Sequence, residues 1–387
     1  MNGFSPSPGL RASLVVTTIF EPLVLKDYYA NFKRYGRLEQ VQIILIPDRK
    51  TPASAWKICE ELSSKGLHCE CPAIEEQEKY LRRVGIDPGV ILYDSDNRRN
   101  VGYLMALEAG SDFLISIDDD NYCLESGDYF AEQAIVTAEA GEHRVADSAT
   151  GYLNICELLT WTTPVKPYPR GFPYAARHKD ENWQIKSQQA DVPINAGLWL
   201  LDPDVDAITW LVSLPKAKGF SGNSLVLGRN SWSPVNTQNT ALRRDVIPSY
   251  YYIRMGYPMS GTTTIDRYGD IFSGYFAQAC VKHMGGAVRF GTPIVEHRRN
   301  SHSYMKDAGR EWACIVLSED LLPWLHDVKL EGKSYLDAYL SLSYLLEDAV
   351  EHFQGAIWSD PVRAYFHQVA YHMRAWLKGC RTILGCR

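Results

Sequence analysis

The stretch ISIDDDNY, residues 115–122, decides the fold of this 387-residue chain, because an apolar strand runs directly into three aspartates. The strand is expected over Phe113–Ile117, and two further β-branched, apolar runs precede it at Leu14–Ile19 and Val41–Ile46. Patterns typical of helices lie between these runs, at 27–35, 53–65 and 100–109. Strands that alternate with helices predict a doubly wound, mostly parallel α/β sheet, with ligands beyond the carboxyl ends of its strands.

The pattern changes after about residue 150. The expected elements there are strands at Ile194–Leu201, Tyr250–Ile253, Val288–Phe290 and Ile294–Val295, and helices at Asp270–Met284, Tyr335–Phe353 and Pro361–Leu377. A further short strand is expected in the first part of the chain, at Val90–Tyr93. Residues 215–240 are rich in Gly, Ser and Asn, which predicts a long loop and a candidate lid over a site. The two final helices are amphipathic, and they could pack on the main domain, lie on a membrane surface or form a contact between copies of the chain.

Composition excludes several classes of protein. The net charge of −6 argues against a general nucleic-acid binder, which needs a basic face. The N-terminus lacks the pattern of a signal peptide, and no apolar stretch is long enough for a transmembrane segment. The nine cysteines are odd in number and include no pair of CxxC motifs, which predicts reduced thiols and a cytoplasmic protein.

Clustered carboxylates after a buried strand predict a site for a hard cation. Asp118 and Asp120, at alternate positions, can present oxygens to one Mn²⁺ or Mg²⁺ that bridges the phosphates of a nucleotide. An acidic turn after a strand is the alternative interpretation. His297 follows a short expected strand in PIVEHRRNSHSY, residues 293–304, and with the aspartates it becomes a candidate third metal ligand.

Arginines in three segments are candidates for binding phosphate. Arg298 and Arg299 follow His297, and Arg98 and Arg99 precede an expected helix; solvated surface charges are the alternative for all four. Arg170 lies between Pro and Gly in YPRGFPYAAR, residues 168–177, where a guanidinium could clamp a diphosphate.

Asp270 lies near the N-terminus of the expected helix in DRYGDIFSGYFAQACVKHMGG, residues 266–286. A carboxylate is electrostatically favoured at that position, so a simple helix cap is one interpretation. The other is a carboxylate that faces sugar hydroxyls as an orienting group or general base.

Five segments in order resemble the reversibly glycosylated polypeptide family, which includes plant UDP-arabinopyranose mutases and related bacterial nucleotide-sugar mutases. They are ISIDDDNY, PRGFPYAAR, INAGLWLLDPDVDA, DRYGDIFSGYFAQ and GTPIVEHRRNS. The first 90 or so residues and the tail after about residue 325 show little resemblance. The plant pattern has adjacent acids where this chain has Gly269 and Asp270, so only Asp270 carries over.

The resemblance implies a GT-A-like catalytic domain over residues 1–325, which binds a nucleotide sugar, and a helical extension over residues 326–387. By position, Asp118, Asp120 and His297 correspond to metal ligands and Asp119 to part of the nucleotide site. Arg170 corresponds to an arginine associated with reversible sugar attachment. Because a guanidinium stays protonated and is a poor nucleophile, we favour Arg170 as a clamp for phosphate or sugar, with covalent attachment left open.

The resemblance further implies a flavin-independent, Mn²⁺- or Mg²⁺-dependent mutase that interconverts pyranose and furanose rings of a nucleoside-diphosphate sugar. UDP-arabinopyranose and a GDP-linked sugar such as GDP-fucose are equally plausible substrates. The alternatives are a glycosyltransferase that uses the same metal site with an external acceptor, and a non-catalytic protein that binds nucleotide sugars. For the C-terminal helices, packing on the main domain is the favoured interpretation, and a homo-oligomer through them is an alternative.

Overall fold

The computed structural model describes residues 5–164, 166–179, 182–220, 222–261, 263–300 and 303–386. Residues 1–4, Ser221 within the predicted loop, and Ser301 at the end of GTPIVEHRRNS lie outside the described residues.

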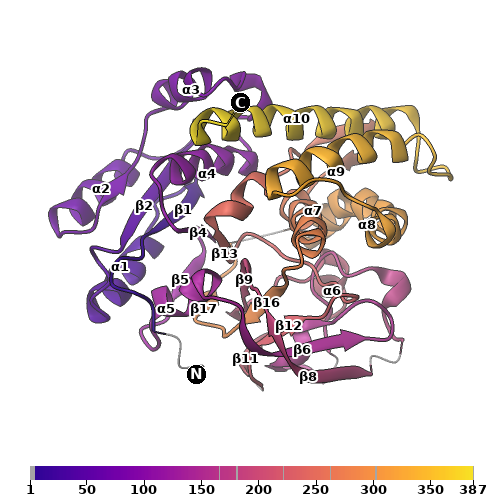
Figure 1. The fold of residues 1–387 in the computed structure, drawn as a ribbon, viewed down its shortest axis with the longest axis horizontal. Helices are drawn as coiled ribbons and strands as arrows, with labels where there is room; N and C mark the ends of the chain where they lie inside the picture. Colours follow the sequence, from indigo (N-terminus) through magenta and orange to yellow (C-terminus); the bar gives the residue numbers. More distant parts are fainter. Residues whose placement is uncertain are drawn as a thin grey trace.

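Three sheets, of ten, five and two strands, and a set of flanking helices make up the fold (Figure 1). The strands are β1 (Ala12–Thr18), β2 (Val41–Pro47), β3 (Cys69–Glu70), β4 (Phe113–Asp118), β5 (Asn121–Cys123), β6 (Gly141–Ser148), β7 (Leu159–Trp161), β8 (Trp183–Ala190), β9 (Ile194–Gly197), β10 (Leu200–Leu201), β11 (Ala217–Phe220), β12 (Leu225–Leu227), β13 (Asn239–Arg243), β14 (Tyr257–Ser260), β15 (Thr263–Ile265), β16 (Val288–Gly291) and β17 (Val295–His297). The α-helices are α1 (Val24–Arg34), α2 (Ser54–Ser64), α3 (Ile74–Arg83), α4 (Arg99–Glu108), α5 (Tyr129–Gln133), α6 (Ala207–Val212), α7 (Gly269–His283), α8 (Tyr304–Asp327), α9 (Tyr335–Ala349) and α10 (Asp360–Leu384).

The main sheet has the strand order β3-β2-β1-β4-β13-β9-β16-β12-β6-β8. Its first four strands are parallel, as the alternation of strands and helices predicts. The later strands mix parallel and antiparallel pairs, beginning with β13 antiparallel to β4. The predicted α/β class with a doubly wound sheet and C-terminal helices is therefore confirmed.

A five-stranded second sheet, with the order β5-β17-β10-β11-β7, holds the segments that carry several candidate site residues. Its strand β5 begins directly after the three aspartates, and β17 pairs with it antiparallel so that His297 lies opposite Asn121. Strand β10 pairs on the other side of β17 and leads into the segment after Leu201. This small sheet therefore joins three segments that are far apart in sequence.

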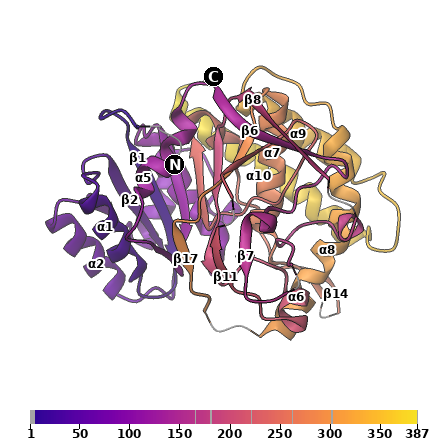
Figure 2. The same cartoon turned by 90° about the horizontal axis from the view of Figure 1, so that it is seen from below.

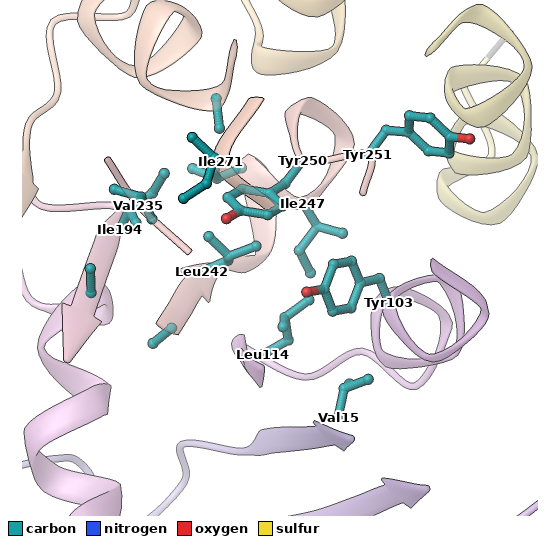
Figure 3. Close-up of a cluster of buried hydrophobic side chains, with 14 of the residues drawn as sticks. Val15, Tyr103, Leu114, Ile194, Val235, Leu242, Ile247, Tyr250, Tyr251 and Ile271 are labelled. Atoms are coloured by element: carbon teal, nitrogen blue, oxygen red, sulfur yellow. The ribbon is translucent and has the colours of Figure 1, made fainter. Parts of the chain in front are cut away.

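The core links the parallel strands to the C-terminal half of the chain (Figure 3). Val15 of β1 and Leu114 of β4 are fully buried, and Tyr250 lies between Leu242 of β13 and Ile271 of α7. The rings of Tyr103 and Tyr250 meet edge to face at 6.3 Å. The aromatic side chains thus fix α7, and with it Asp270, relative to the sheet.

The C-terminal helices α9 and α10 lie side by side across one side of the molecule (Figure 1). The indole of Trp376 is buried and donates to the carbonyl oxygen of Pro248 at 2.9 Å, and the Tyr365 hydroxyl donates to that of Arg254 at 3.0 Å. Figure 2 shows α1 and α2 at the opposite end of the molecule from α8 and α9. The helices thus pack on the main sheet domain, while the predicted boundary at residue 325 falls in the last turn of α8 and stays a prediction, as does a homo-oligomer.

Several predictions of local structure are wrong. Residues 88–90 form a 3₁₀ turn and Tyr250–Ile253 is irregular, so neither expected strand exists. The predicted loop 215–240 contains β11 and β12, and β12 is buried in the main sheet. Because Gln238 is the one described residue of this segment that lines the main cavity, the segment does not form a lid in this structure.

The prediction of reduced thiols is wrong for one pair. Cys59 of α2 and Cys69 of β3 form a disulfide, with their Cα atoms 5.2 Å apart. The spacing of ten residues carries no recognisable motif, so the helix-to-strand packing rather than the sequence pattern brings the two sulfur atoms together.

Candidate active site

A cavity of about 560 Å³ opens at the carboxyl ends of β1, β2 and β4. This is the edge where a parallel sheet binds its ligands. Most of the predicted site residues line the cavity, and Arg298 is absent from its described lining. The predicted residues that it brings together are Arg98, Arg99, Asp118, Asp119, Asp120, Arg170, Asp270, His297 and Arg299.

The first two aspartates are held by groups of the protein. Asp118 lies opposite Thr17 in the parallel β1–β4 pair, and its Oδ1 accepts from Arg99 Nη2 at 2.6 Å. The Thr18 hydroxyl donates to Asp119. Burial raises the pKa of Asp118 to about 6 and that of Asp119 to about 7, with a smaller upward contribution from Asp120 in each case.

Asp120 faces His297 instead. Its Oδ2 lies 3.3 Å from His297 Nε2, and the other ring nitrogen, Nδ1, lies 2.7 Å from the carbonyl oxygen of Asp202. Burial alone would raise the pKa of Asp120, but the hydrogen bond and charge of His297 bring it below its ordinary value. Burial would likewise lower the pKa of His297, and Asp120 raises it above its ordinary value. The β5–β17 pairing therefore produces a buried carboxylate–imidazole pair from two predicted metal ligands.

This pair fits a divalent cation. A carbonyl partner on one ring nitrogen orients the other nitrogen toward a metal, which is the usual outer-shell arrangement of a histidine ligand. Among the described residues, no three His, Cys, Asp or Glu side chains are gathered as a complete cage. Asp118, the third predicted ligand, is engaged with Arg99. The donor set therefore suits a cation whose remaining ligands are phosphate oxygens and water.

Arg170 is held between two carboxylates. Its Nε and Nη2 donate to Asp204 at 2.8 and 3.2 Å, and its Nη1 and Nη2 donate to Asp270 at 3.0 and 2.6 Å. Nη1 also donates to the carbonyl oxygen of Arg267. These contacts engage all five N–H donors of the guanidinium. Although burial lowers it, the pKa of Arg170 lies well above its ordinary value because of Asp204 and Asp270. Arg170 must exchange a partner before it can clamp a phosphate.

Sequence reasoning missed Asp204. Its side chain is buried and lines the cavity, and it also accepts from Asn236 Nδ2 at 2.6 Å. Burial opposes ionisation, but Arg170 lowers the pKa of Asp204 below its ordinary value, so the carboxylate stays charged. The alternating acids of DPDVD, residues 202–206, were the available signal: the carboxylate of Asp206 pairs with Arg177, as that of Asp204 pairs with Arg170.

Arg98 and Arg99 are structural in their present contacts. Arg98 donates to Gln77 and to the carbonyl oxygen of Ile91, and its guanidinium lies 4.3 Å from the centre of the Tyr93 ring. Arg99 donates to Ser116 at 3.0 Å as well as to Asp118. The two side chains therefore support the floor of the cavity.

Arg298 and Arg299 point in different directions. Arg298 is exposed and pairs with Glu296 at 2.9 Å. Arg299 lines the cavity with a side chain that is 10% exposed, and its nearest carboxylate among the described residues, Asp307, is 3.8 Å away. Of the four predicted phosphate-binding arginines, Arg299 is the one whose guanidinium donates no hydrogen bond within the part of the chain that the structure describes.

No helix among the described residues combines the length and apolarity needed to cross a bilayer. The family model described as "Reversibly glycosylated polypeptide" matches residues 66–384. The match reaches further than the sequence resemblance suggested, because it includes nearly all of the C-terminal helices.

Curated relatives carry mutase names. "UDP-arabinopyranose mutase 1" of Arabidopsis thaliana is 24% identical over 305 residues, which cover 77% of this chain and 76% of the relative. "Probable UDP-arabinopyranose mutase 1" of Pisum sativum is 24% identical over 348 residues, with coverages of 88% and 84%.

Solved structures are more distant. Glucosyl-3-phosphoglycerate synthase from Mycobacterium tuberculosis, in complex with Mn²⁺ and UDP-glucose, has a TM-score of 0.39 and 11% identity over 80% of this chain and 79% of its own. A mannosyltransferase from Pyrobaculum calidifontis, in complex with GDP-Man and Mn²⁺, has a TM-score of 0.37 and 10% identity over 99% and 77% of the two chains.

Proposed function

The chain belongs to the reversibly glycosylated polypeptide family, and we propose that it is a metal-dependent, flavin-independent nucleotide-sugar mutase that interconverts pyranose and furanose rings. The named UDP-arabinopyranose mutases among its relatives support an intramolecular sugar mutase. The observation that carries the metal dependence is the buried Asp120–His297 pair at the carboxyl end of the parallel strands. A UDP-arabinopyranose-like or GDP-fucose-like compound is the proposed substrate.

Asp120 and His297 are the proposed ligands of Mn²⁺ or Mg²⁺, and Asp118 can join them only by giving up its ion pair with Arg99. The bound cation would neutralise the charge of the diphosphate as the bond from the sugar to the phosphate breaks. Arg299 supports the same step, because its buried guanidinium is available to donate to a phosphate oxygen.

The sugar then needs a proton acceptor when its ring closes through a different hydroxyl. Asp270 and Asp204 both line the cavity, and Arg170 keeps them in place through paired hydrogen bonds. We assign Asp270 as the group that takes and returns the hydroxyl proton, with Asp204 beside it. Arg170 is assigned the role of holding these two carboxylates; sugar attachment to its guanidinium would require breaking at least one of their contacts.

The cavity must also exclude water, or the sugar would hydrolyse. Ile19 and Phe20 line it from the segment after β1, and they are among the exposed large apolar side chains of the protein. A bound nucleotide would cover these two side chains and close this side of the cavity.

The test is an incubation of the pure protein with UDP- or GDP-sugars and Mn²⁺, without any acceptor. A mutase gives an isomer of unchanged mass, which chromatography separates from the starting material. Free nucleoside diphosphate as the product instead supports a transferase or a hydrolase, and binding without conversion supports a binding protein. Asp270→Asn should abolish conversion, whereas Arg298→Gln, a substitution of an exposed arginine beside the same strand, should leave it unchanged.

A further inference from the structure

A second cavity, of about 420 Å³, lies where α7 and α8 end. No described residue lines both cavities. Helix α7 carries Asp270 at its first turn and Lys282 at its last, and its 15 residues span about 22 Å. The second cavity is therefore separate from the candidate active site.

The second cavity is rich in basic groups. Arg229, Lys282 and Lys329 line it, together with His283 and His326, and Asp327 is the one carboxylate of its described lining. Within the described residues, no carboxylate lies within 4 Å of the three cationic groups. Three cations without a carboxylate partner therefore line one cavity in a chain with a net charge of −6.

Helix ends explain part of this charge. Lys282 and His283 occupy the last turn of α7 and His326 that of α8, where cations offset the helix dipole. Two helix C-termini supply about one negative charge in total. Arg229 belongs to the segment after β12 and Lys329 to the segment after α8, so positive charge remains after both dipoles and Asp327 are counted.

The wall of the cavity is ordered by ring stacking and hydrogen bonds, and it contains polar atoms that lack a hydrogen-bond partner in the described structure. His326 stacks on the Trp232 indole, with ring centres 4.8 Å apart and planes at 14°, and its Nε2 is buried without a hydrogen-bond partner in the described structure. Lys282 Nζ donates to the carbonyl oxygens of Gly228 and Arg229 at 2.8 and 3.0 Å. An ammonium has three N–H donors, so one remains.

The electrostatics of the wall agree with a site for an anion. The pKa of Lys282 is lowered to about 7, mainly by burial; Asp147 of β6 opposes this change in part, and the charge of Arg229 adds to it. Burial, followed by the charge of Lys282, also lowers the pKa of His326 to about 4. The cationic forms of both groups are disfavoured here, and an oxyanion beside them would reverse this.

We propose that this second cavity, between Arg229, Lys282, His326 and Lys329, binds a small molecule that bears a phosphate group. The apolar side chains of Leu325, Val328 and Leu330 line the same cavity and provide contacts for an apolar or flat body next to that group. The ligand is therefore either an organic phosphate, which would contact both the cations and the apolar side chains, or orthophosphate, which would contact the cations alone.

The test is isothermal titration calorimetry with phenyl phosphate and with orthophosphate, in low salt and excess chelator so that the metal site does not contribute. We expect saturable binding at one site, weakened at least tenfold by Arg229→Gln/Lys329→Gln. Both residues are exposed, so the fold is retained. Lys186→Gln/Lys218→Gln makes the same change of charge at exposed positions outside both cavities and should change the affinity less than twofold.

The two probes distinguish the two kinds of ligand. Phenyl phosphate that binds tenfold more tightly than orthophosphate indicates an organic phosphate, and equal affinities indicate orthophosphate. A second measurement avoids substitution of the buried residues. Phenyl phosphate should slow the acylation of Lys282 in peptide mapping by mass spectrometry and leave that of Lys186 unchanged. The proposal is overturned by the absence of saturable binding, by equal weakening in both double variants, or by unprotected Lys282.

Discussion

Replacing Arg170 by Met should be among the most destabilising single substitutions in this protein. The change leaves the buried carboxylates of Asp204 and Asp270 without their shared cation. Breaking a buried ion pair by removing one partner costs about 3–5 kcal/mol. At ~2.1 cal/mol/K per residue, 387 residues give an unfolding entropy of about 0.8 kcal/mol/K, so 4 kcal/mol corresponds to a fall of roughly 5 °C in melting temperature.

The sharper expectation concerns the triple variant Arg170→Met/Asp204→Asn/Asp270→Asn. Because it also removes the two uncompensated charges, it should be more stable than Arg170→Met alone, by at least about 1 kcal/mol. Both variants should be inactive, so stability is measured by urea unfolding and calorimetry. Arg298→Met, at an exposed ion pair, should stay within about 0.5 kcal/mol of the wild type. A triple variant less stable than the single one would refute the reasoning that these carboxylates depend on one guanidinium.

Three further outcomes follow from individual contacts. His297→Gln should abolish the rise in melting temperature that Mn²⁺ and a nucleoside diphosphate together give the wild type, since a ligand stabilises only as far as it binds; an unchanged rise would exclude the proposed metal pair. Gly171→Ala should cost roughly 2–4 kcal/mol in urea unfolding, because φ is +86° and the new Cβ would lie 2.3 Å from Ile271 Cγ2; a loss below 1 kcal/mol would contradict this. Burial lowers the pKa of His372 to about 4, so on acidification His372 takes up its proton at a higher pH in the unfolded chain than in the folded protein. This difference should lower the free energy of unfolding by about 3 kcal/mol between about pH 6.5 and pH 4. His372→Gln should reduce that fall and exposed His352→Gln should not, and equal pH profiles for the two variants would refute the assignment.

The parallel half of the fold was predictable because its local signals agree with each other. Leu14–Ile19 and Val41–Ile46 are mostly apolar and β-branched runs, as strands buried on both faces require, and the helices between them have clear amphipathic patterns. In the second half, by contrast, the strands are short and their burial depends on distant partners. Strand β12 has three residues within a Gly- and Asn-rich segment, so only its pairing with β6 and β16 distinguishes it from a loop.

In the candidate site, too, local patterns were predictable and contacts between distant segments were not. A local pattern located Asp120 and His297, because Asp120 comes two residues after the apolar strand β4 and His297 ends the short strand β17. The hydrogen-bond partners of the candidate arginines were not predictable from the sequence pattern. Arg98 and Arg299 look alike in sequence and both line the cavity, yet the guanidinium of Arg98 donates to Gln77 and that of Arg299 donates no hydrogen bond in the described structure. Asp204 was missed for a related reason, since its function depends on a guanidinium 34 residues earlier in the chain.

The charge of the main cavity gives an independent argument for a cation. Its described lining contains nine aspartates against seven lysines and arginines, with His297 in addition. The most central of the arginines are already committed, Arg99 to Asp118 and Arg170 to Asp204 and Asp270. A nucleoside diphosphate would bring further negative charge next to these aspartates, and the committed arginines can offset it only by giving up their present partners. Binding therefore requires added positive charge, and Asp120 with His297 provides the place where a divalent cation can supply it.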